Sequence, residues 1–214
     1  KYSNHMSLPE TIVYSGTCRS ISNRISQDNV SLSAALCCKA IKLRTSNVNG
    51  EIVIWAHATD SVEKESFMAD KWITYEYDGW KVELSLSLLG EMRIDREKAL
   101  PNETGGVLIG AYDIARKHIY VVYQVRAPED SISSPTSFIR GCANLPERLK
   151  YIHETTLDNL TYIGEWHSHP SANTQRSTDD IKLHKAIVGY NRKNCLPGCM
   201  MILGSDNFSF FIDE

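Results

Sequence analysis

The stretch GEWHSHPSANTQRSTDD, residues 164–180, contains the features that decide the fold. It follows residues with a strand pattern, and His167 and His169 stand one residue apart where that strand ends. Side chains alternate along a strand, so both imidazoles lie on the same side. Asp180 begins the next predicted helix, where its carboxylate can turn back toward them. Two histidines and one carboxylate form a ligand set of hydrolytic zinc sites.

A second interpretation of the same stretch needs no metal. A histidine pair of this spacing is weak evidence by itself, because most such pairs are ordinary exposed or hydrogen-bonded residues. Ser177 and Asp180 also fit a capping box, with Ser177 as the N-cap and Asp180 as the third helical residue. The two interpretations compete, since one carboxylate is not expected to serve the cap and a metal fully.

The sequence around this stretch predicts a mixed sheet with helices. Asp78-Gly79 separates two β-rich runs and is a strong hairpin signal. Residues 126–142 are rich in Ser and Pro and are predicted to form a loop. The predicted strands are 72–77, 80–86, 105–113, 118–125, the segment leading to His167, 199–205 and 207–213, and the predicted helices are 87–99, 145–157 and 177–190. This mixture predicts an α/β or α+β domain around one curved sheet, over residues 71–214.

The N-terminal segment, residues 1–70, differs from the rest. Residues 28–43 place apolar side chains at helical spacing after Asp28, a plausible N-cap. A turn at Asn49-Gly50 and a strand in EIVIWAHA follow, and the polar residues 59–70 read as a linker. Such a small αβ segment cannot bury much surface alone, so we expect it to pack on another element.

Composition excludes several classes of function. The chain has 214 residues, of which 42% are apolar, and a formal net charge of −3. These values fit one large domain, or one domain with a smaller attachment, and do not suggest a nucleic-acid partner. No run approaches the ~18–20 apolar residues of a membrane helix, and the first ten residues lack the apolar core of a signal peptide. The six cysteines form no disulfide or zinc-knuckle pattern, which favours a reducing, cytoplasmic location.

The spacing of the central stretch resembles the signature of the JAMM metallopeptidases, also called JAB or MPN-plus domains. The shared string is H-x-H-P-x6-S-x-x-D, with Pro170 and Ser177 in place. Upstream, NETGGVLIG at residues 102–110 looks like the glutamate and glycine-containing strand of that family, and Glu103 precedes His167 by 64 positions. The resemblance covers roughly residues 80–212. It implies the JAMM/MPN-like (cytidine-deaminase-like) fold, a mixed curved sheet flanked by helices.

The resemblance also implies roles for single residues. His167, His169 and Asp180 would be the zinc ligands. Glu103 would take a proton from the attacking water, and Ser177 would donate a hydrogen bond to the oxyanion of the scissile carbonyl. Without the histidine pair, Glu103 would read as a solvated residue before a strand. Because every position of the set is occupied, the resemblance favours an active peptidase.

Two neighbouring residues receive no role in the site. His184 lies one turn beyond Asp180 and could orient a ligand, but a half-buried helix residue is the commoner explanation. Glu165 points to the opposite face of the strand from Trp166, and we assign it no catalytic role.

Residues 12–57 weakly resemble the C-terminal end of a ThiF-like adenylating domain. The features are the stretch around Cys18, the helix at 28–43 and the strand after Gly50. In that family a thioester-forming cysteine occupies a place comparable to Cys18, although an ordinary loop cysteine is the explanation that we prefer. The glycine-rich nucleotide loop of that family is absent from these 214 residues. The resemblance implies the C-terminal part of a fusion between an activating enzyme and a JAB domain.

Together these resemblances imply a zinc-dependent isopeptidase or peptidase. It would hydrolyse the bond after the C-terminus of a ubiquitin-like protein, in deconjugation or precursor maturation, within a bacterial conjugation system, some of which act in antiphage defence. Its expected partners are the ubiquitin-like protein or its conjugates, and an activating-enzyme domain in the same full-length chain, with no nucleic acid and no membrane. The alternatives are a non-catalytic MPN-like module that binds a ubiquitin-like protein, and a metallohydrolase for small amides.

Overall fold

The computed structural model describes residues 11–15, 40–44, 53–58, 61–68, 72–155 and 160–214. Most of residues 72–214 fold around one seven-stranded sheet. Its strands are β5 (Trp72–Tyr77), β6 (Trp80–Ser85), β7 (Gly105–Asp113), β8 (His118–Arg126), β11 (Thr161–Ser168), β12 (Gly198–Leu203) and β13 (Phe208–Asp213). The helices described are α3 (Leu86–Ala99), α4 (Leu145–Thr155) and α5 (Thr178–Asn191), with short 3-10 turns at Ile114–Arg116 and Arg192–Asn194.

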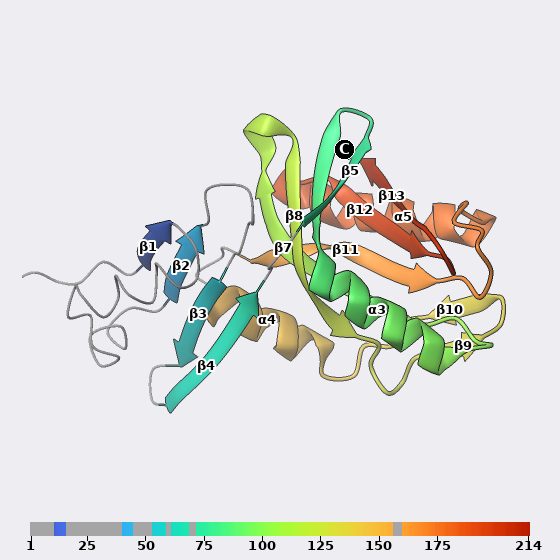
Figure 1. The fold of residues 1–214 in the computed structure, drawn as a ribbon, viewed down its shortest axis with the longest axis horizontal. Helices are drawn as coiled ribbons and strands as arrows, with labels where there is room; N and C mark the ends of the chain where they lie inside the picture. Colours follow the sequence, from blue (N-terminus) through green and yellow to red (C-terminus); the bar gives the residue numbers. More distant parts are fainter. Residues whose placement is uncertain (1–10, 16–39, 45–52, 59–60, 69–71, 156–159) are drawn as a thin grey trace, which may run out of the picture.

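The sheet is mixed, with the strand order β13-β12-β11-β7-β8-β6-β5. The pairs β11–β12 and β6–β8 are parallel, and the other neighbours are antiparallel. The sheet is strongly curved (Figure 1), and edge-to-face aromatic contacts such as Tyr75 with Phe210 bring the two edge strands close together. The prediction of a mixed, curved sheet flanked by helices is confirmed. Strand β11 lies inside this sheet, so its end is supported from both sides.

The β5–β6 hairpin follows the predicted turn. Asp78 and Gly79 have φ angles of 47° and 78°, the left-handed values that a tight two-residue hairpin requires. Strand β5 pairs with β6 from Trp72 opposite Ser85 to Tyr77 opposite Trp80. The hairpin predicted from Asp78-Gly79 is therefore confirmed, and the structure adds its register.

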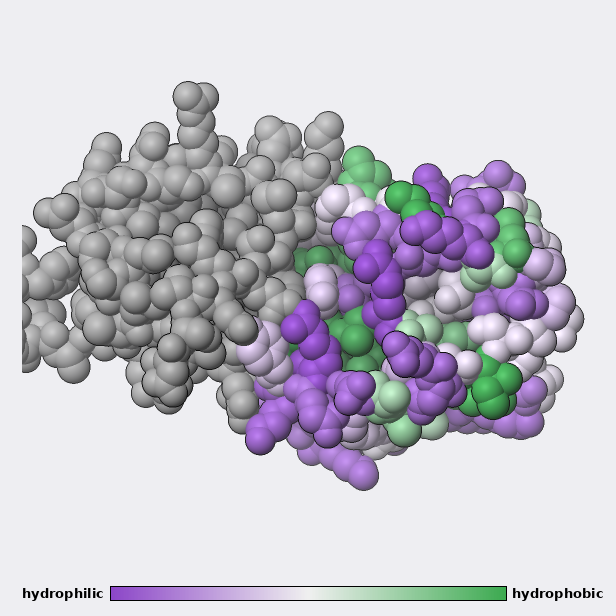
Figure 2. Space-filling model, turned by 90° about the horizontal axis from the view of Figure 1, so that it is seen from below, coloured by the Kyte–Doolittle hydropathy of each residue, from purple (hydrophilic) through white to green (hydrophobic). Residues whose placement is uncertain are grey.

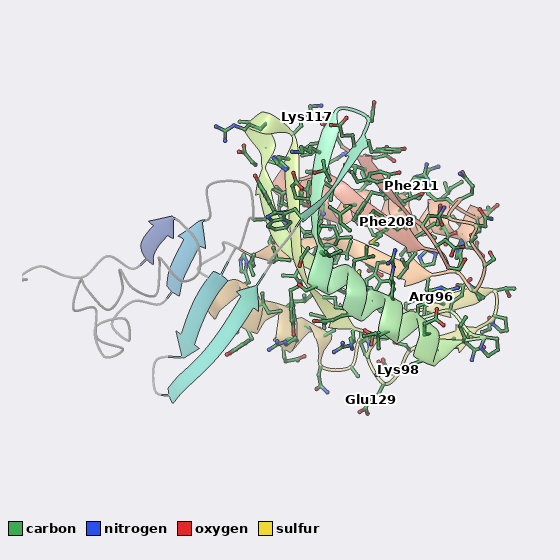
Figure 3. All side chains as sticks on the ribbon, in the orientation of Figure 1. Arg96, Lys98, Lys117, Glu129, Phe208 and Phe211 are labelled. Carbon is green, nitrogen blue, oxygen red and sulfur yellow. The ribbon has the colours of Figure 1, made fainter. Side chains whose placement is uncertain are left out.

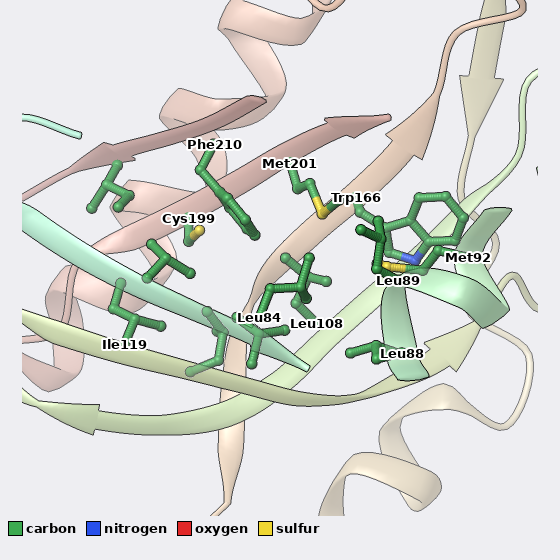
Figure 4. Close-up of a cluster of buried hydrophobic side chains, with 14 of the residues drawn as sticks. Leu84, Leu88, Leu89, Met92, Leu108, Ile119, Trp166, Cys199, Met201 and Phe210 are labelled. Atoms are coloured by element: carbon green, nitrogen blue, oxygen red, sulfur yellow. The ribbon is translucent and has the colours of Figure 1, made fainter. Parts of the chain in front are cut away.

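The two faces of the sheet carry different helices. Helix α3 covers one face, where Leu88, Leu89 and Met92 pack against the strands. Figure 4 shows this core, whose labelled strand residues are Leu84, Leu108, Ile119, Trp166, Cys199, Met201 and Phe210. On the other face α4 buries Leu145 and Ile152 against β7 and β8, and α5 packs on β12. Since neighbouring side chains along a strand face opposite sides, Trp166 enters the first core while His167 faces the side of α4 and α5.

The N-terminal segment forms a separate sheet, in the order β1-β2-β3-β4. Its strands are β1 (Thr11–Ser15), β2 (Ala40–Arg44), β3 (Val53–Ala58) and β4 (Ser61–Met68) (Figure 1). The strand predicted before residue 58 is present as β3. The helix predicted over 28–43 is wrong at its end, because residues 40–43 pair as a strand, and its earlier part lies outside the described residues. Cys18 also lies outside them.

Two segments expected to be irregular contain strands. The residues predicted as a linker, 59–70, include β4, which pairs antiparallel with β3. The loop predicted over 126–142 contains a small hairpin of β9 (Ile132–Ser134) and β10 (Ser137–Ile139). In both cases a partner strand supplies backbone hydrogen bonds that outweigh the weak β-propensity of the polar side chains. This hairpin, residues 132–139, is called the 132–139 hairpin below.

The surface of the described residues is mostly polar on the face drawn in Figure 2. Hydrophilic side chains dominate that view, and hydrophobic ones occur in small separate groups. Such scattered apolar residues are usual on a folded domain. None of the helices in the described part of the chain has the length and apolar character needed to cross a bilayer.

Glycines of the sheet allow its close backbone approaches, and this predicts a contrast between two substitutions. A Cβ at Gly164, beside a bulge in β11, would overlap the carbonyl oxygen of Cys199. A Cβ at Gly90, within α3, meets nothing within 4 Å. We expect Gly164→Ala to lower the free energy of unfolding by roughly 3 kcal/mol and Gly90→Ala to raise it by about 0.5–1 kcal/mol. Urea unfolding of both variants measures this, and equal effects would contradict the packing described.

Candidate functional site

The end of β11 positions the two histidines. His167 is paired with Gly105 of β7 on one side and with Ile202 of β12 on the other, and it is only 4% exposed. The chain leaves the strand directly after Ser168, and the backbone N–H of His169 still donates to the Leu203 carbonyl at 2.9 Å. The two imidazoles come together with their Nε2 atoms 3.3 Å apart.

Asp180, in the first turn of α5, completes the group. Its Oδ1 lies 3.1 Å from Nε2 of His167, and its Oδ2 lies 3.8 Å from Nε2 of His169. The three potential ligand atoms are all within 4.8 Å of one another. Ligands about 2.0–2.2 Å from a tetrahedral zinc are roughly 3.3–3.6 Å apart. The separations in the structure are close to that range, so the three side chains fit a zinc ion without large movement.

The tautomer of His169 also suits a metal. Its Nδ1 is 2.7 Å from the carbonyl oxygen of Asn173. A carbonyl can only accept, so Nδ1 carries the proton and donates it. The lone pair then resides on Nε2, the atom that faces His167 and Asp180. Carbonyl partners of this kind commonly orient metal-binding histidines.

The capping box is present together with the ligand arrangement. Oγ of Ser177 accepts from the Asp180 backbone N–H at 3.2 Å, and Oδ2 of Asp180 accepts from the Ser177 backbone N–H at 2.7 Å. Oδ1 stays directed at His167. The expected competition between cap and ligand is therefore absent, because the two carboxylate oxygens divide the roles. Ser177 caps through its oxygen lone pair, which leaves its hydroxyl hydrogen available to donate.

Glu103 is held beside this group by backbone contacts. Thr104 N–H donates to Oγ of Ser168 at 3.0 Å, and Ser168 N–H donates to the Thr104 carbonyl at 2.7 Å. These bonds fasten the residue after Glu103 to the residue after His167. Glu103 is 8% exposed. Burial raises the pKa of its carboxyl above the ordinary value, and the charges of His167 and His169 offset part of that rise.

Glu103 and the histidine group line one cleft of about 730 Å³. One wall comes from the start of α5, and the other comes from residues 135–140 in and around β10. The wall formed by residues 135–140 is attached to the segment just before β7, because the backbone N–H of Glu103 donates to the Ser134 carbonyl at 2.9 Å. Phe138 reaches to Gly105, where a Cβ would collide with its ring and with the Trp166 carbonyl. All five residues with predicted roles, His167, His169, Asp180, Glu103 and Ser177, line this cleft.

Arg96 is a supporting residue that the sequence analysis missed. It is 3% exposed on α3 (Figure 3), and it donates through Nε to the His169 carbonyl at 3.0 Å and through a terminal nitrogen to the Pro170 carbonyl at 2.7 Å. It therefore holds the backbone that carries His169. A signal was present, because Arg96 follows Leu88 and Met92 at four-residue steps, which places a charge on the buried stripe of the helix.

His184 lies away from the site, in agreement with its omission. Its Nε2 is 3.1 Å from the Gly198 carbonyl, and its Nδ1 is 2.8 Å from a terminal nitrogen of Arg176 and 3.5 Å from Oδ2 of Asp213. Burial is the largest influence on this imidazole and lowers its pKa. It anchors α5 to β12 and does not approach the histidine group.

The family match covers the part of the chain that builds the cleft. Residues 85–213 match the family described as prokaryotic homologs of the JAB domain. The chain is 33% identical over 148 residues to a protein named CD-NTase/cGAS isopeptidase from Enterobacter hormaechei subsp. hoffmannii (strain UCI 50), covering 68% of this chain and 81% of that protein. Similar solved structures include a protein from Desulfitobacterium hafniense (22% identity, TM-score 0.40, 60% and 80% coverage). A JAB1/MPN domain protein from Archaeoglobus fulgidus is also similar (17%, 0.34, 58% and 82%).

The contacts of Asp180 with the two histidines predict that the free energy of unfolding depends on pH. The prediction applies to protein from which a chelator has removed any metal. Burial raises the pKa of this carboxyl, but the hydrogen bond and charge of His167 and the hydrogen bonds of Ser177 together outweigh burial, and the net pKa is well below its ordinary value. A lowered pKa stabilises the folded state above the unfolded value of about 3.9, and the stabilisation is lost as the pH falls through the folded value. Asp180→Asn should therefore cost about 1–3 kcal/mol at pH 6, and this cost should start to shrink below about pH 4 and be measurably smaller at pH 3.

Asp179→Asn is the matched control, because Asp179 is the exposed neighbour of Asp180 and forms a surface ion pair with Lys182. It should change the unfolding free energy by under about 0.5 kcal/mol at both pH values. Chemical denaturation at pH 6 and pH 3 measures both variants. A loss for Asp180→Asn that is the same at the two pH values would contradict the assignment.

Proposed function

This chain belongs to the prokaryotic homologs of the JAB domain, and from the chemistry of its cleft we propose that it is a zinc-dependent isopeptidase. The observation that carries the proposal is the single cleft that gathers two imidazoles, a carboxylate and a separate buried carboxylate, Glu103. We assign His167, His169 and Asp180 as metal ligands, Glu103 as general base, and Ser177 as an oxyanion donor.

The donor set fits zinc better than a hard cation. Two neutral imidazole nitrogens with one carboxylate oxygen suit zinc, whereas calcium and magnesium prefer all-oxygen sites. Zinc bound by three protein groups keeps a position open for water or substrate, lowers the pKa of that water toward ~7 and polarises a carbonyl. The fixed tautomer of His169 and the buried position of His167 favour binding through their facing Nε2 atoms.

The protein groups then divide the proton transfers. The carboxylate of Glu103 takes the proton of the attacking water and gives it to the departing amine, which makes the amine a better leaving group. Burial of Glu103 brings its pKa closer to neutrality and so suits both steps. The hydroxyl of Ser177 has its hydrogen available, and it donates to the oxygen of the scissile carbonyl as negative charge develops there.

The name of the Enterobacter relative supports the substrate class that we propose. The Enterobacter protein is named an isopeptidase, and we extend that activity to this chain. We propose that the bond hydrolysed joins the C-terminus of a ubiquitin-like protein to an amine or to a short extension. A division into residues 1–70 and 71–214, with the first part derived from an activating-enzyme domain, is part of this proposal. A role in antiphage defence and a cytoplasmic location stay predictions.

Zinc content tests the ligand assignment. Protein purified without chelator, or reconstituted with zinc, should contain about one zinc per chain by atomic emission. His167→Ala/His169→Ala should contain almost none, and His153→Ala, at an exposed position on α4 outside the cleft, serves as the control. The control should keep its zinc. Absence of zinc from reconstituted wild-type protein would reject the catalytic assignment and favour a module that only binds a ubiquitin-like protein.

Glu103→Gln tests the general base. The variant keeps the shape of the side chain but cannot accept the proton, so we expect full zinc content and cleavage slowed about a hundredfold to ten-thousandfold. The assay follows release of a C-terminal extension from fusions of bacterial ubiquitin-like proteins by mass spectrometry. Glu129→Gln is the control, because Glu129 is exposed on the loop after β8 (Figure 3). Cleavage by Glu103→Gln at the wild-type rate would show that another group is the base.

A further inference from the structure

Three polar residues of the cleft region have no part in the chemistry proposed above. Glu165, on β11, is 7% exposed and faces the same side as His167, two residues later. A terminal nitrogen of Arg140 donates to Oε1 of Glu165 at 2.8 Å, and the hydroxyl of Tyr162 donates to the same oxygen at 3.3 Å. Arg140 and Glu165 both line the cleft. A buried carboxylate is costly unless it is paired, so this arrangement requires Arg140 to stay in place.

Arg140 belongs to the wall of the cleft and Glu165 to its floor. Arg140 directly follows β10, and its other terminal nitrogen donates to the neighbouring Gly141 carbonyl at 2.7 Å. The guanidinium is thus held between its own backbone and β11. A planar guanidinium with two such contacts has a defined orientation, which an ammonium group would not have.

The 132–139 hairpin needs such an attachment because it is not part of the large sheet. Strands β9 and β10 pair with each other in a sheet of two strands. One end of the hairpin is tied to Glu103 by the bond from its N–H to the Ser134 carbonyl. The base is closed locally, where the Asp130 carboxylate accepts from the backbone N–H groups of Cys142 and Ala143. The Arg140–Glu165 pair ties the remaining strand, β10, to β11.

We propose that Arg140 and Glu165 are positioning residues that set the 132–139 hairpin at a fixed distance from the metal ligands and thereby determine how tightly the cleft binds an extended chain. This inference rests on the proposed function for the identity of the substrate. The placement of the hairpin itself does not depend on it. Since neither residue exchanges a proton in the reaction, their loss acts on substrate binding in the ground and transition states alike, and so on KM.

The test uses the whole chain loaded with zinc. Arg140→Met keeps the length of the side chain and removes the pair, and Arg140→Lys keeps the charge but not the two-pronged contact. The matched control is Arg116→Met, which removes an exposed pair with Asp113 on the 3-10 turn after β7. Hydrogen–deuterium exchange is followed over residues 132–139, together with zinc content and melting temperature. Steady-state cleavage uses whichever ubiquitin-like fusion the wild-type protein cleaves.

We expect exchange in the hairpin to accelerate by about tenfold or more in Arg140→Met, with zinc retained and exchange in β7 and β12 unchanged. KM should rise about tenfold with kcat within about twofold of wild type. The exchange rate and KM of Arg140→Lys should lie between those of wild type and Arg140→Met. Arg116→Met should match wild type in all measurements. If Arg140→Met does not fold, Arg140→Lys alone carries the test, with a smaller change in the same direction.

Unchanged exchange over residues 132–139 in both Arg140 variants would overturn the proposal. So would a fall in kcat at constant KM, because it would place Arg140 in the chemical step. If the wild-type protein binds zinc but cleaves no fusion, the proposed function fails while the exchange measurement still decides the positioning role. The two failures are therefore distinguishable.

Discussion

His167 lies directly opposite Gly105 in the antiparallel pairing of β11 with β7, and Ile202 of β12 supports it from the other side. This close pairing places the residue after Glu103 against the residue after His167, where Thr104 and Ser168 exchange two hydrogen bonds. A side chain at position 105 would collide with the Trp166 carbonyl, so the approach requires glycine. The distance between Glu103 and the histidine group is thus a property of the sheet, and the other parts of the cleft are attached to it.

Charged side chains attach the irregular segments to this frame. Arg96, from the opposite face of the sheet, holds the carbonyl groups of His169 and Pro170, and the Arg140–Glu165 pair holds the hairpin. Loops lack the repeated backbone bonds of helices and strands, so a buried guanidinium with several donors is an effective way to fix one. The cleft therefore has one wall that belongs to α5 and another that is held by a backbone hydrogen bond from Glu103 and by side-chain contacts. Holding reacting groups in a fixed geometry can lower the activation free energy of a reaction substantially. Contacts that fix the cleft are therefore expected to matter for the proposed activity.

At the start of α5 one carboxylate makes two different contacts. Asp180 contributes Oδ2 to the capping box and keeps Oδ1 on His167. The cap fixes the rotation of the carboxylate, and an oriented carboxylate is a better ligand than a mobile one. The positive end of the helix dipole also favours a negative group at this position. The cap of α5 and the contact between Asp180 and His167 therefore support each other here.

Local patterns in the sequence determined much of the protein. The Asp78-Gly79 turn, the alternation along the strands and the spacing from His167 to Asp180 predicted the elements around the cleft, because each depends on residues close in the chain. The predictions were wrong where pairing between strands decided the outcome, as in β4 and the hairpin β9–β10. Arg96, Arg140 and Glu165 meet their partners only in the folded chain, with Arg96 73 residues from His169 and Arg140 25 residues from Glu165. The periodic patterns of helices and strands relate only residues that are close in the chain, so they cannot reveal contacts over such separations. Tertiary structure alone therefore decided how the cleft is held.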